Sequence, residues 1–222
     1  MTIDLAYVGE IFPILARAAL VNVLAACVAF SLALVGGLFL ALARLSTVRV
    51  LRLLATGIIE FVRDTPFLIQ LFFIFYVLPR YGITFGPLET GIVALGLHWS
   101  AYTSEVYRAG IASVPSGQWD AATALNLPAS RTWGRIILPQ AILPVLPTLG
   151  NYLIVMFKDT AILSTIAVSE LLGVALGQAS LSFRYVETLT LVAILFLAMS
   201  LGASAVFRTV EGIMRPRELT RN

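Results

Sequence analysis

Long apolar runs, separated by short polar segments, dominate the chain. The five longest runs lie at about 18–43, 53–78, 90–111, 141–157 and 188–208. A helix that crosses a bilayer takes roughly 20 predominantly apolar residues, which is close to the length of each run. The pattern predicts an all-α integral membrane protein with about five transmembrane helices, organised as a single domain over residues 1–222.

Smaller features predict how these helices pack. The run at 162–176 is apolar but too short to cross a bilayer comfortably, so we expect a re-entrant half-helix there. Gly36 and Gly37 offer a point of close helix packing in the first run. Glu105 and Arg108 are three residues apart near the end of the third run, which favours a structural salt bridge.

The second run carries charges that a membrane span rarely holds. Glu60, Arg63, Asp64 and Gln70 lie inside it, beside Pro66. Pro66 removes a backbone hydrogen bond and should bend the helix. An unpaired charge at mid-bilayer costs about 2.5–3.5 kcal/mol or more, so we expect Glu60 and Arg63 to pair. Two interpretations stay open: a structural ion pair between packed helices, or a polar patch that lines a path for a zwitterionic solute.

Polar residues also close the fourth run. Lys158, Asp159 and Thr160 come directly before the half-helix, which contains Glu170. Broken helices with polar ends are where secondary transporters commonly hold their substrate, and we apply that rule by analogy. One interpretation, which stays open, is that at least one of Asp159, Thr160 and Glu170 contacts a substrate.

The placement of the arginines predicts the orientation of the chain. With the N-terminus outside, ten basic residues fall in the inside segments and four in the outside segments. The inside residues are Arg44, Arg49, Arg52, Arg108, Arg131, Arg135, Arg208, Arg215, Arg217 and Arg221, and the outside residues are Arg17, Arg80, Lys158 and Arg184. This bias predicts that the C-terminus and the loop at 114–139 lie in the cytoplasm.

The loop at 114–139 begins with a short helical pattern. Its sequence from Gln118 is QWDAATALN, which contains good helix formers. Ser116 or Gly117 can cap a helix that begins at Gln118. Asp120 then falls in the first turn, where a carboxylate suits the positive end of the helix dipole.

The same loop then turns and starts a second helical pattern. Asn126 suits the left-handed conformation that ends a helix, and Pro128 suits the first turn of the next one. Trp133, Ile136 and Ile137 form one apolar face. The loop is either a connector on the membrane surface or a docking element that presents a small, alanine-rich helix to a cytoplasmic partner.

Composition supports the membrane assignment and excludes several activities. Of the 222 residues, 59% are hydrophobic and 12% are charged, against about a quarter charged in soluble domains. Lys158 is the only lysine, and NYLIVMF before it lacks the glycines of a P-loop, so any nucleotide energy must come from a partner.

Cys27 and His98 each stand alone, so we expect no disulfide and no metal site. No Ser–His–Asp arrangement suggests an enzyme, and the acidic N-terminus lacks the basic start of a signal peptide.

Five stretches of the sequence resemble one family of membrane proteins. VPSGQWDAATALN and IILPQAILPVLPTLGN resemble the EAA loop of ABC-transporter permeases, specifically of the polar amino acid uptake permeases. Further similar stretches are EFVRDTPFLIQLFFIFY, AYTSEVYRAGI and KDTAILSTIAVSEL, and the resemblance covers roughly residues 53–171. Three positions depart from the family pattern: Asp120 stands for Glu, Asn126 for Gly, and Asp64 for the Gly of Arg-Gly-Thr-Pro.

The resemblance implies a fold, partners and site residues. It implies the type I ABC importer permease fold, with a coupling helix that sits in a cleft of a separate ATPase subunit. The implied ATPase contacts are Gln118, Asp120, Ala121, Ala122 and Asn126. The candidates for the substrate path are Glu60, Arg63, Asp64, Thr65, Gln70, Lys158, Asp159, Thr160 and Glu170.

It also implies an assembly in the bacterial inner membrane. The partners would be an ATPase dimer, which binds ATP and Mg²⁺, and a second permease subunit that is identical or related. An extracytoplasmic substrate-binding protein and membrane lipid would complete the assembly, and nucleic acid would have no part in it. The chain itself would hold no cofactor. The substrate would be a polar amino acid or a related zwitterion, with an ectoine-like solute as a further option. The alternative function is a stand-alone secondary transporter driven by an ion gradient.

Overall fold

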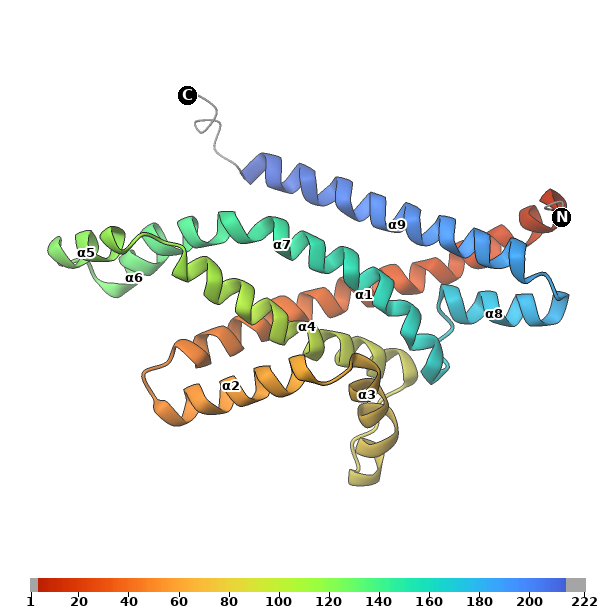
Figure 1. The fold of residues 1–222 in the computed structure, drawn as a ribbon, viewed down its shortest axis with the longest axis horizontal. Coiled ribbons are helices and arrows are strands. Elements are labelled where there is room, and N and C mark those ends of the chain that lie inside the picture. Colours follow the sequence, from red (N-terminus) through yellow and green to blue (C-terminus); the bar gives the residue numbers. More distant parts are fainter. Residues whose placement is uncertain (1–3, 215–222) are drawn as a thin grey trace.

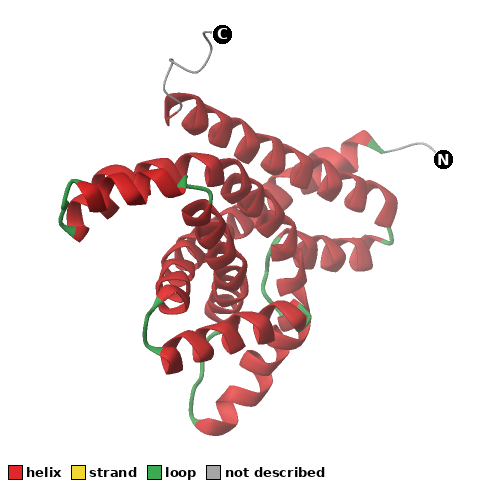
Figure 2. Cartoon of the chain, turned by 60° about the vertical axis from the view of Figure 1, so that its left-hand side comes forward, coloured by secondary structure: helices red, strands yellow, loops and turns green. Residues whose placement is uncertain are grey.

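The computed structural model describes residues 4–214, and every regular element in that range is helical (Figures 1 and 2). The long helices are α1 (Leu5–Leu45), α4 (Pro87–Ala112), α7 (Leu138–Asp159) and α9 (Tyr185–Met214). The shorter ones are α2 (Arg49–Asp64), α3 (Phe67–Phe72), η1 (Phe73–Val77), η2 (Leu78–Tyr81), α5 (Ser116–Ala124), α6 (Ala129–Arg131), η3 (Thr132–Ile137), η4 (Thr160–Ile166) and α8 (Leu171–Ser182). The all-α prediction is confirmed; Arg215, Arg217 and Arg221, used for the orientation, lie outside the described residues.

Helix α1 is longer than its predicted span of 18–43. Asp4 caps its start, because the Asp4 carboxylate accepts hydrogen bonds from the backbone N–H groups of Ala6 and Tyr7. The first turns of the helix contain Glu10, which is charged and exposed, so a span predicted from apolar residues does not extend to these turns. The helix therefore projects beyond the part of the chain that hydrophobicity alone marks.

Small residues bring α1 and α4 close together. Ala25, Ala26, Ala29 and Ala33 on α1 are almost completely buried. A Cβ atom added to Gly37 would lie 2.7 Å from Cβ of Thr103, which is closer than real Cβ contacts. The predicted close packing point in the first run is confirmed, and its partner is α4.

The second predicted span, 53–78, is broken. The direction of the chain turns by 107° between α2 and the helical segment that starts at Phe67. Pro66 lies at the break in an extended conformation, so the predicted bend is confirmed. Glu60, Arg63 and Asp64 consequently lie in the last turns of α2 and not in the middle of a straight span, as the sequence analysis expected.

Helix α4 occupies the centre of the molecule, with α1, α2 and α7 around it (Figure 1). The helices at Leu5–Arg44, Ala129–Ile166 and Tyr185–Thr209 are long and apolar enough to cross a membrane, and the bent pair of α2 with Phe67–Tyr81 makes a fourth candidate. Helix α4 has 26 residues, but several of its polar side chains are buried against neighbouring helices. Together with α4, these four candidate spans correspond to the five apolar runs predicted from the sequence.

The second helix of the 114–139 loop is not a separate element. Residues Ala129–Ile166 form one long, continuous helical rod, in which α6 passes through η3 into α7. The π-helical turn η3 ends two residues before Pro139, which has no backbone N–H to donate to the preceding turn. The prediction of two short helices between spans is therefore wrong for the second one.

The half-helix expected at 162–176 begins later than predicted. The tight helix η4 ends at Ala167, which adopts a left-handed conformation with φ of 60°. Helix α8 then starts at Leu171 and lies beside α9 (Figure 1). The reversal between η4 and α8 places the polar residues that follow α7 against α1 and α4.

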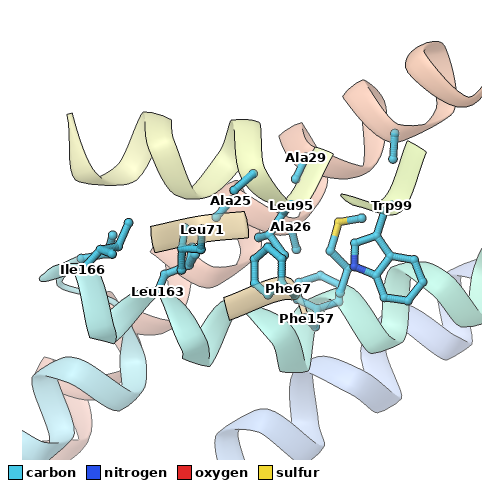
Figure 3. Packing of buried hydrophobic residues seen from close by; sticks show 14 residues of the cluster. Ala25, Ala26, Ala29, Phe67, Leu71, Leu95, Trp99, Phe157, Leu163 and Ile166 are labelled. Atoms are coloured by element: carbon cyan, nitrogen blue, oxygen red, sulfur yellow. The ribbon is translucent and has the colours of Figure 1, made fainter. Parts of the chain in front are cut away.

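The main core lies where α1, α3, α4 and α7 meet. Figure 3 shows Phe67 and Leu71 of α3 facing Leu95 of α4, with Phe157 and Leu163 close by. The core is asymmetric, because α1 contributes mainly alanines while the other helices contribute large side chains. This packing holds the broken span against α4 and fixes the polar groups described next.

Candidate functional site

Helix α5 presents an exposed polar surface at one end of the molecule (Figure 1). Gln118, Asp120, Ala121 and Asn126 are exposed, whereas Ala122 is only 3% exposed. The helix ends as predicted, because Asn126 adopts the left-handed conformation with φ of 49°. Four of the five predicted coupling residues are therefore accessible to a partner.

The start of α5 differs from the prediction. The helix begins at Ser116, so Pro115, and not Ser116 or Gly117, occupies the flanking position. Asp120 consequently lies beyond the first turn, and its predicted role in helix-dipole capping is wrong. The exposed Asp120 carboxylate has no ion-pair partner among the described residues.

Apolar contacts fix α5 to the start of the long rod. The rings of Trp119 and Trp133 meet edge to face, with centroids 5.1 Å apart. Ile137 is fully buried and packs in a cluster with Val114 and Ala141, which confirms the predicted apolar face of this segment. These contacts attach α5 to the helix that continues into α7.

A three-residue ionic cluster lies near this end of α4. Nε and Nη2 of Arg108 donate to Oε2 of Glu105 at 3.0 and 2.9 Å, which confirms the predicted salt bridge. Arg44 of α1 pairs with the other oxygen of the same carboxylate. Both oxygens of Glu105 are therefore occupied, and the cluster joins α1 to α4.

A polar side chain bridges the break between α2 and α3. The Gln70 amide donates to the backbone oxygens of Val62 and Thr65 at 2.7 and 3.0 Å. Nδ1 of His98 lies 3.1 Å from Oε1 of Gln70, an oxygen that can only accept, so Nδ1 carries the hydrogen. Gln70 thus satisfies carbonyls that the broken helix leaves free and connects the break to α4.

The predicted ion pair between Glu60 and Arg63 is absent from residues 4–214. Both side chains are exposed, and the Arg63 guanidinium lies over the ring of Tyr102 instead, 5.5 Å from its centroid. The expectation was wrong because a stacking partner on α4 is within reach of Arg63. Asp64 is also exposed, and Thr65 donates from Oγ1 to the backbone oxygen of Phe61 at 2.8 Å.

The polar candidates at the end of α7 and directly after it divide into two groups. Lys158 is exposed and Asp159 is partly buried, with Oδ2 accepting a hydrogen bond of 3.1 Å from Nε1 of Trp99. Thr160 and Glu170 are fully buried. The four candidates of this segment therefore do not share one environment.

Asn22 of α1 holds the buried group together. Its Nδ2 donates to Oγ1 of Thr160 at 2.9 Å and to Oε2 of Glu170 at 2.8 Å, while its Oδ1 accepts from the backbone N–H of Leu171. The Glu170 carboxylate also accepts from the N–H groups of Leu172 and Gly173 and caps α8. This cluster joins α1, η4 and α8.

The residues that complete these contacts were not predicted from the sequence. Asn22 was overlooked, although it is an isolated amide in a nearly charge-free run. Trp99, Tyr102 and Tyr152 were not singled out as a site, because aromatic side chains are common in membrane helices. The spacing of Trp99 and Tyr102 on one face of α4 was the available signal.

Comparison with known proteins identifies the family. Residues 33–217 match the family described as "Binding-protein-dependent transport system inner membrane component". The chain belongs to this family. Inner membrane components of this kind are multi-pass proteins, in agreement with the apolar helices described above.

Similar proteins and solved structures support this family assignment. A probable amino-acid ABC transporter permease of Sinorhizobium fredii is 43% identical over 94% of this chain and 90% of its own length. The nopaline transport system permease of Agrobacterium fabrum is 32% identical over 98% of this chain and 95% of its own. A solved amino acid ABC transporter with histidines superimposes with a TM-score of 0.88 at 33% identity, covering 95% of this chain and 99% of that one.

These findings decide between the two functions that the sequence left open. The chain is the transmembrane subunit of an ABC transporter with the type I permease fold, and the ion-gradient alternative receives no support. A methionine ABC transporter in inward-facing form shares the fold with a TM-score of 0.73, although only 16% of residues are identical.

Proposed function

We propose that this permease subunit imports a polar amino acid or a related zwitterion, driven by ATP hydrolysis in a separate ATPase dimer. The amino-acid permeases among its relatives support this substrate class over an ectoine-like solute. The assembly contains a second permease subunit, identical or related, and receives its substrate from an extracytoplasmic binding protein. ATP and Mg²⁺ bind to the ATPase and not to this chain.

The observation that carries the coupling role is the construction of α5. The helix is exposed along Gln118, Asp120 and Ala121, yet its aromatic contact at Trp119 and Trp133 fixes it to the rod that becomes α7. A push on α5 therefore moves α7 and the polar residues at its far end. On this proposal, α5 and the C-terminus lie in the cytoplasm, the N-terminus lies outside, and Asp120 meets a basic group of the ATPase.

The proposed substrate path runs along the polar residues that remain accessible. These are Glu60, Arg63, Asp64, Thr65 and Gln70 at the break between α2 and α3, and Lys158 and Asp159 at the end of α7. Thr160 and Glu170 were also candidates, but their burial and hydrogen bonds favour a structural role.

Uptake into proteoliposomes tests this function. The permease, its ATPase and its binding protein are reconstituted together, and uptake of labelled amino acids is measured with ATP enclosed. We expect uptake that requires ATP and persists when ionophores collapse the ion gradients. Uptake that stops with the ionophores and ignores ATP would contradict the proposal.

The coupling role has its own test. Asp120→Lys reverses the charge that faces the ATPase, so we expect uptake to fall at least about tenfold, as when a close interfacial charge pair becomes repulsive. Glu10→Gln, which changes an exposed carboxylate on α1, serves as the control and should leave uptake unchanged. Unchanged uptake by Asp120→Lys, with normal membrane insertion, would exclude Asp120 from docking.

A further inference from the structure

Two unpaired arginines begin α2, at the turn that follows α1. Arg49 and Arg52 are exposed and form no ion pair among residues 4–214. Nη1 of Arg52 donates to the backbone oxygen of Ser46 at 3.5 Å, which holds its guanidinium beside the turn. The nearest acid along α2 is Glu60, eight residues after Arg52 and about 12 Å further along the helix axis. The start of α2 therefore carries positive charge that its own helix does not neutralise.

The ionic cluster beside this turn is also positive. Arg44 and Arg108 share a single carboxylate, that of Glu105, so the cluster contains two cations and one anion. Leu45, which follows Arg44, lines one groove together with Arg108 and with Trp119 of α5. The turn, the cluster and α5 consequently lie at the same end of the molecule (Figure 1). The paired arginines thus add to the positive charge of the unpaired ones.

An exposed apolar stripe runs along α2 from the same end. Its members are between 51% and 68% exposed and repeat at helical spacing: Val50, Leu54, Ile58 and Phe61. Helix α2 packs against α1 and α4 along a different edge, which contains the buried Ala55 and Ile59. Eleven residues separate Val50 from Phe61, so the stripe is about 16 Å long. The hydrocarbon core of a bilayer is about 30 Å thick, so the stripe matches the depth of one leaflet.

Charge and shape together select one kind of occupant. Guanidinium groups bind phosphate oxygens through paired hydrogen bonds. The cytoplasmic leaflet carries anionic lipids, which attract arginines close to its surface. A phospholipid places its phosphate directly above its acyl chains, the same order as the arginines and the stripe of α2. A soluble anion would gain nothing from the stripe, and an acidic protein would have to enter the leaflet to cover it.

We propose that the start of α2 is a binding site for an anionic phospholipid of the inner leaflet. Arg49 and Arg52 hold the phosphate, and the acyl chains lie along the stripe from Val50 to Phe61. The site rests on the proposed function, because it uses the orientation that places this turn and α5 in the cytoplasm. The other end of α2 is the break before Pro66, so the bound lipid supports the helix that leads to the candidate substrate path.

Lipid titration of the permease–ATPase complex tests the site. Native mass spectrometry in detergent counts the phosphatidylglycerol and phosphatidylcholine molecules that the complex retains at each concentration. We expect the wild type to bind phosphatidylglycerol more tightly than phosphatidylcholine. Replacing both arginines, Arg49→Gln with Arg52→Gln, should weaken phosphatidylglycerol binding about fivefold for each charge removed, which corresponds to about 1 kcal/mol per charge. Binding of phosphatidylcholine should change much less.

Three further variants separate charge, shape and folding. Arg80→Gln is the matched control, because it removes an exposed arginine from η2, and it should bind phosphatidylglycerol as the wild type does. Arg49→Lys with Arg52→Lys keeps both charges and should retain most of the affinity. Leu54→Ser interrupts the stripe and should weaken both lipids about three- to fivefold, because part of an apolar side chain loses its contact with the acyl chains.

Two results would overturn the site. One is wild-type affinity for phosphatidylglycerol in the double glutamine variant; loss of the ATPase from that variant would then assign the arginines to the protein partner. The other is displacement of phosphatidylglycerol by glycerol phosphate, which has the phosphate but no acyl chain, because the ligand would then be a soluble anion. Failure of the proposed function looks different, because the complete wild-type assembly would then import no amino acid with ATP, whatever lipid it binds.

Discussion

Glu170 and Asp159 are carboxylates of the same short segment, and the structure gives them opposite environments. Glu170 is fully buried and accepts hydrogen bonds from Asn22, Leu172 and Gly173. Asp159 is partly buried, and its side chain accepts one hydrogen bond, from Trp99, among the described residues. The difference shows that an acid in a membrane bundle should be interpreted from its partners. A satisfied carboxylate stabilises the fold, and an unsatisfied one is available to a solute.

The strongest test of this comparison is removal of the satisfied carboxylate. Glu170→Ala leaves the Asn22 amide and two backbone N–H groups without their acceptor and removes the cap of α8. We expect the free energy of unfolding to fall by about 3 kcal/mol or more, since bonds to a charged acceptor contribute roughly 1.5–3 kcal/mol each. Thermal unfolding of the purified chain in detergent measures the loss.

Asp159→Asn is the matched control for Glu170→Ala. It should change the free energy of unfolding by less than about 1 kcal/mol, because asparagine retains an oxygen that can accept from Trp99. Equal losses of stability in the two variants would show that Glu170 and Asp159 contribute equally to the stability of the fold.

Removal of Asn22 should have the next largest effect. Asn22→Ala takes away the donor to Thr160 and Glu170 and the acceptor for the Leu171 N–H. We expect a loss of about 2 kcal/mol in the free energy of unfolding, because buried polar groups lose their partner. Amino acid uptake by the folded variant should stay at the wild-type level, whereas Asp159→Asn should lower it, because Asp159 lies on the proposed substrate path. An Asn22→Ala variant that keeps its stability but loses uptake would place Asn22 on the substrate path.

We expect a smaller loss in the free energy of unfolding where α1 and α4 pack closely. Gly37→Ala adds a Cβ atom that would lie 2.7 Å from Cβ of Thr103, so the two helices must separate slightly. We expect about 1–2 kcal/mol of destabilisation, which is typical of a tightly packed site that is overfilled. Gly57→Ala is the control, because a Cβ atom there meets open space within 4 Å. Equal unfolding temperatures for the two variants would contradict the close approach.

Local signals in the sequence were sufficient for some of these features and insufficient for others. Asn126 and the Glu105–Arg108 pair were predicted because turn chemistry and helix spacing act within a few residues. Arg63 was assigned to Glu60, but it stacks on Tyr102, which is 39 residues further along the chain. Asn22 lies 148 residues from Glu170. Contacts between residues so far apart in the sequence depend on which helices pack together, and hydrophobic periodicity does not predict that packing.

The smallest effect on stability is expected at Asp4, a partly exposed carboxylate that caps a helix as Glu170 does. The Arg184 guanidinium donates to Oδ2 of Asp4 at 2.5 Å and, with the Tyr7 N–H, lowers the pKa of Asp4 below its ordinary value of 3.8. A carboxyl group with a lowered pKa stabilises the fold fully above that ordinary value. The stabilisation disappears as the pH falls through the lower pKa of the folded state.

Unfolding temperatures of the wild type and Asp4→Asn test this assignment between about pH 6 and about pH 3. Asparagine keeps the helix cap and removes the charge, so the two proteins should differ by a small and constant amount above pH 3.8. The difference should shrink as the pH falls further, and salt should reduce it because both side chains are exposed to solvent. A difference that grows as the pH falls would show that Asp4 does not act as an ionised partner of Arg184, and that exposed and buried caps of this protein do not follow the same electrostatic rule.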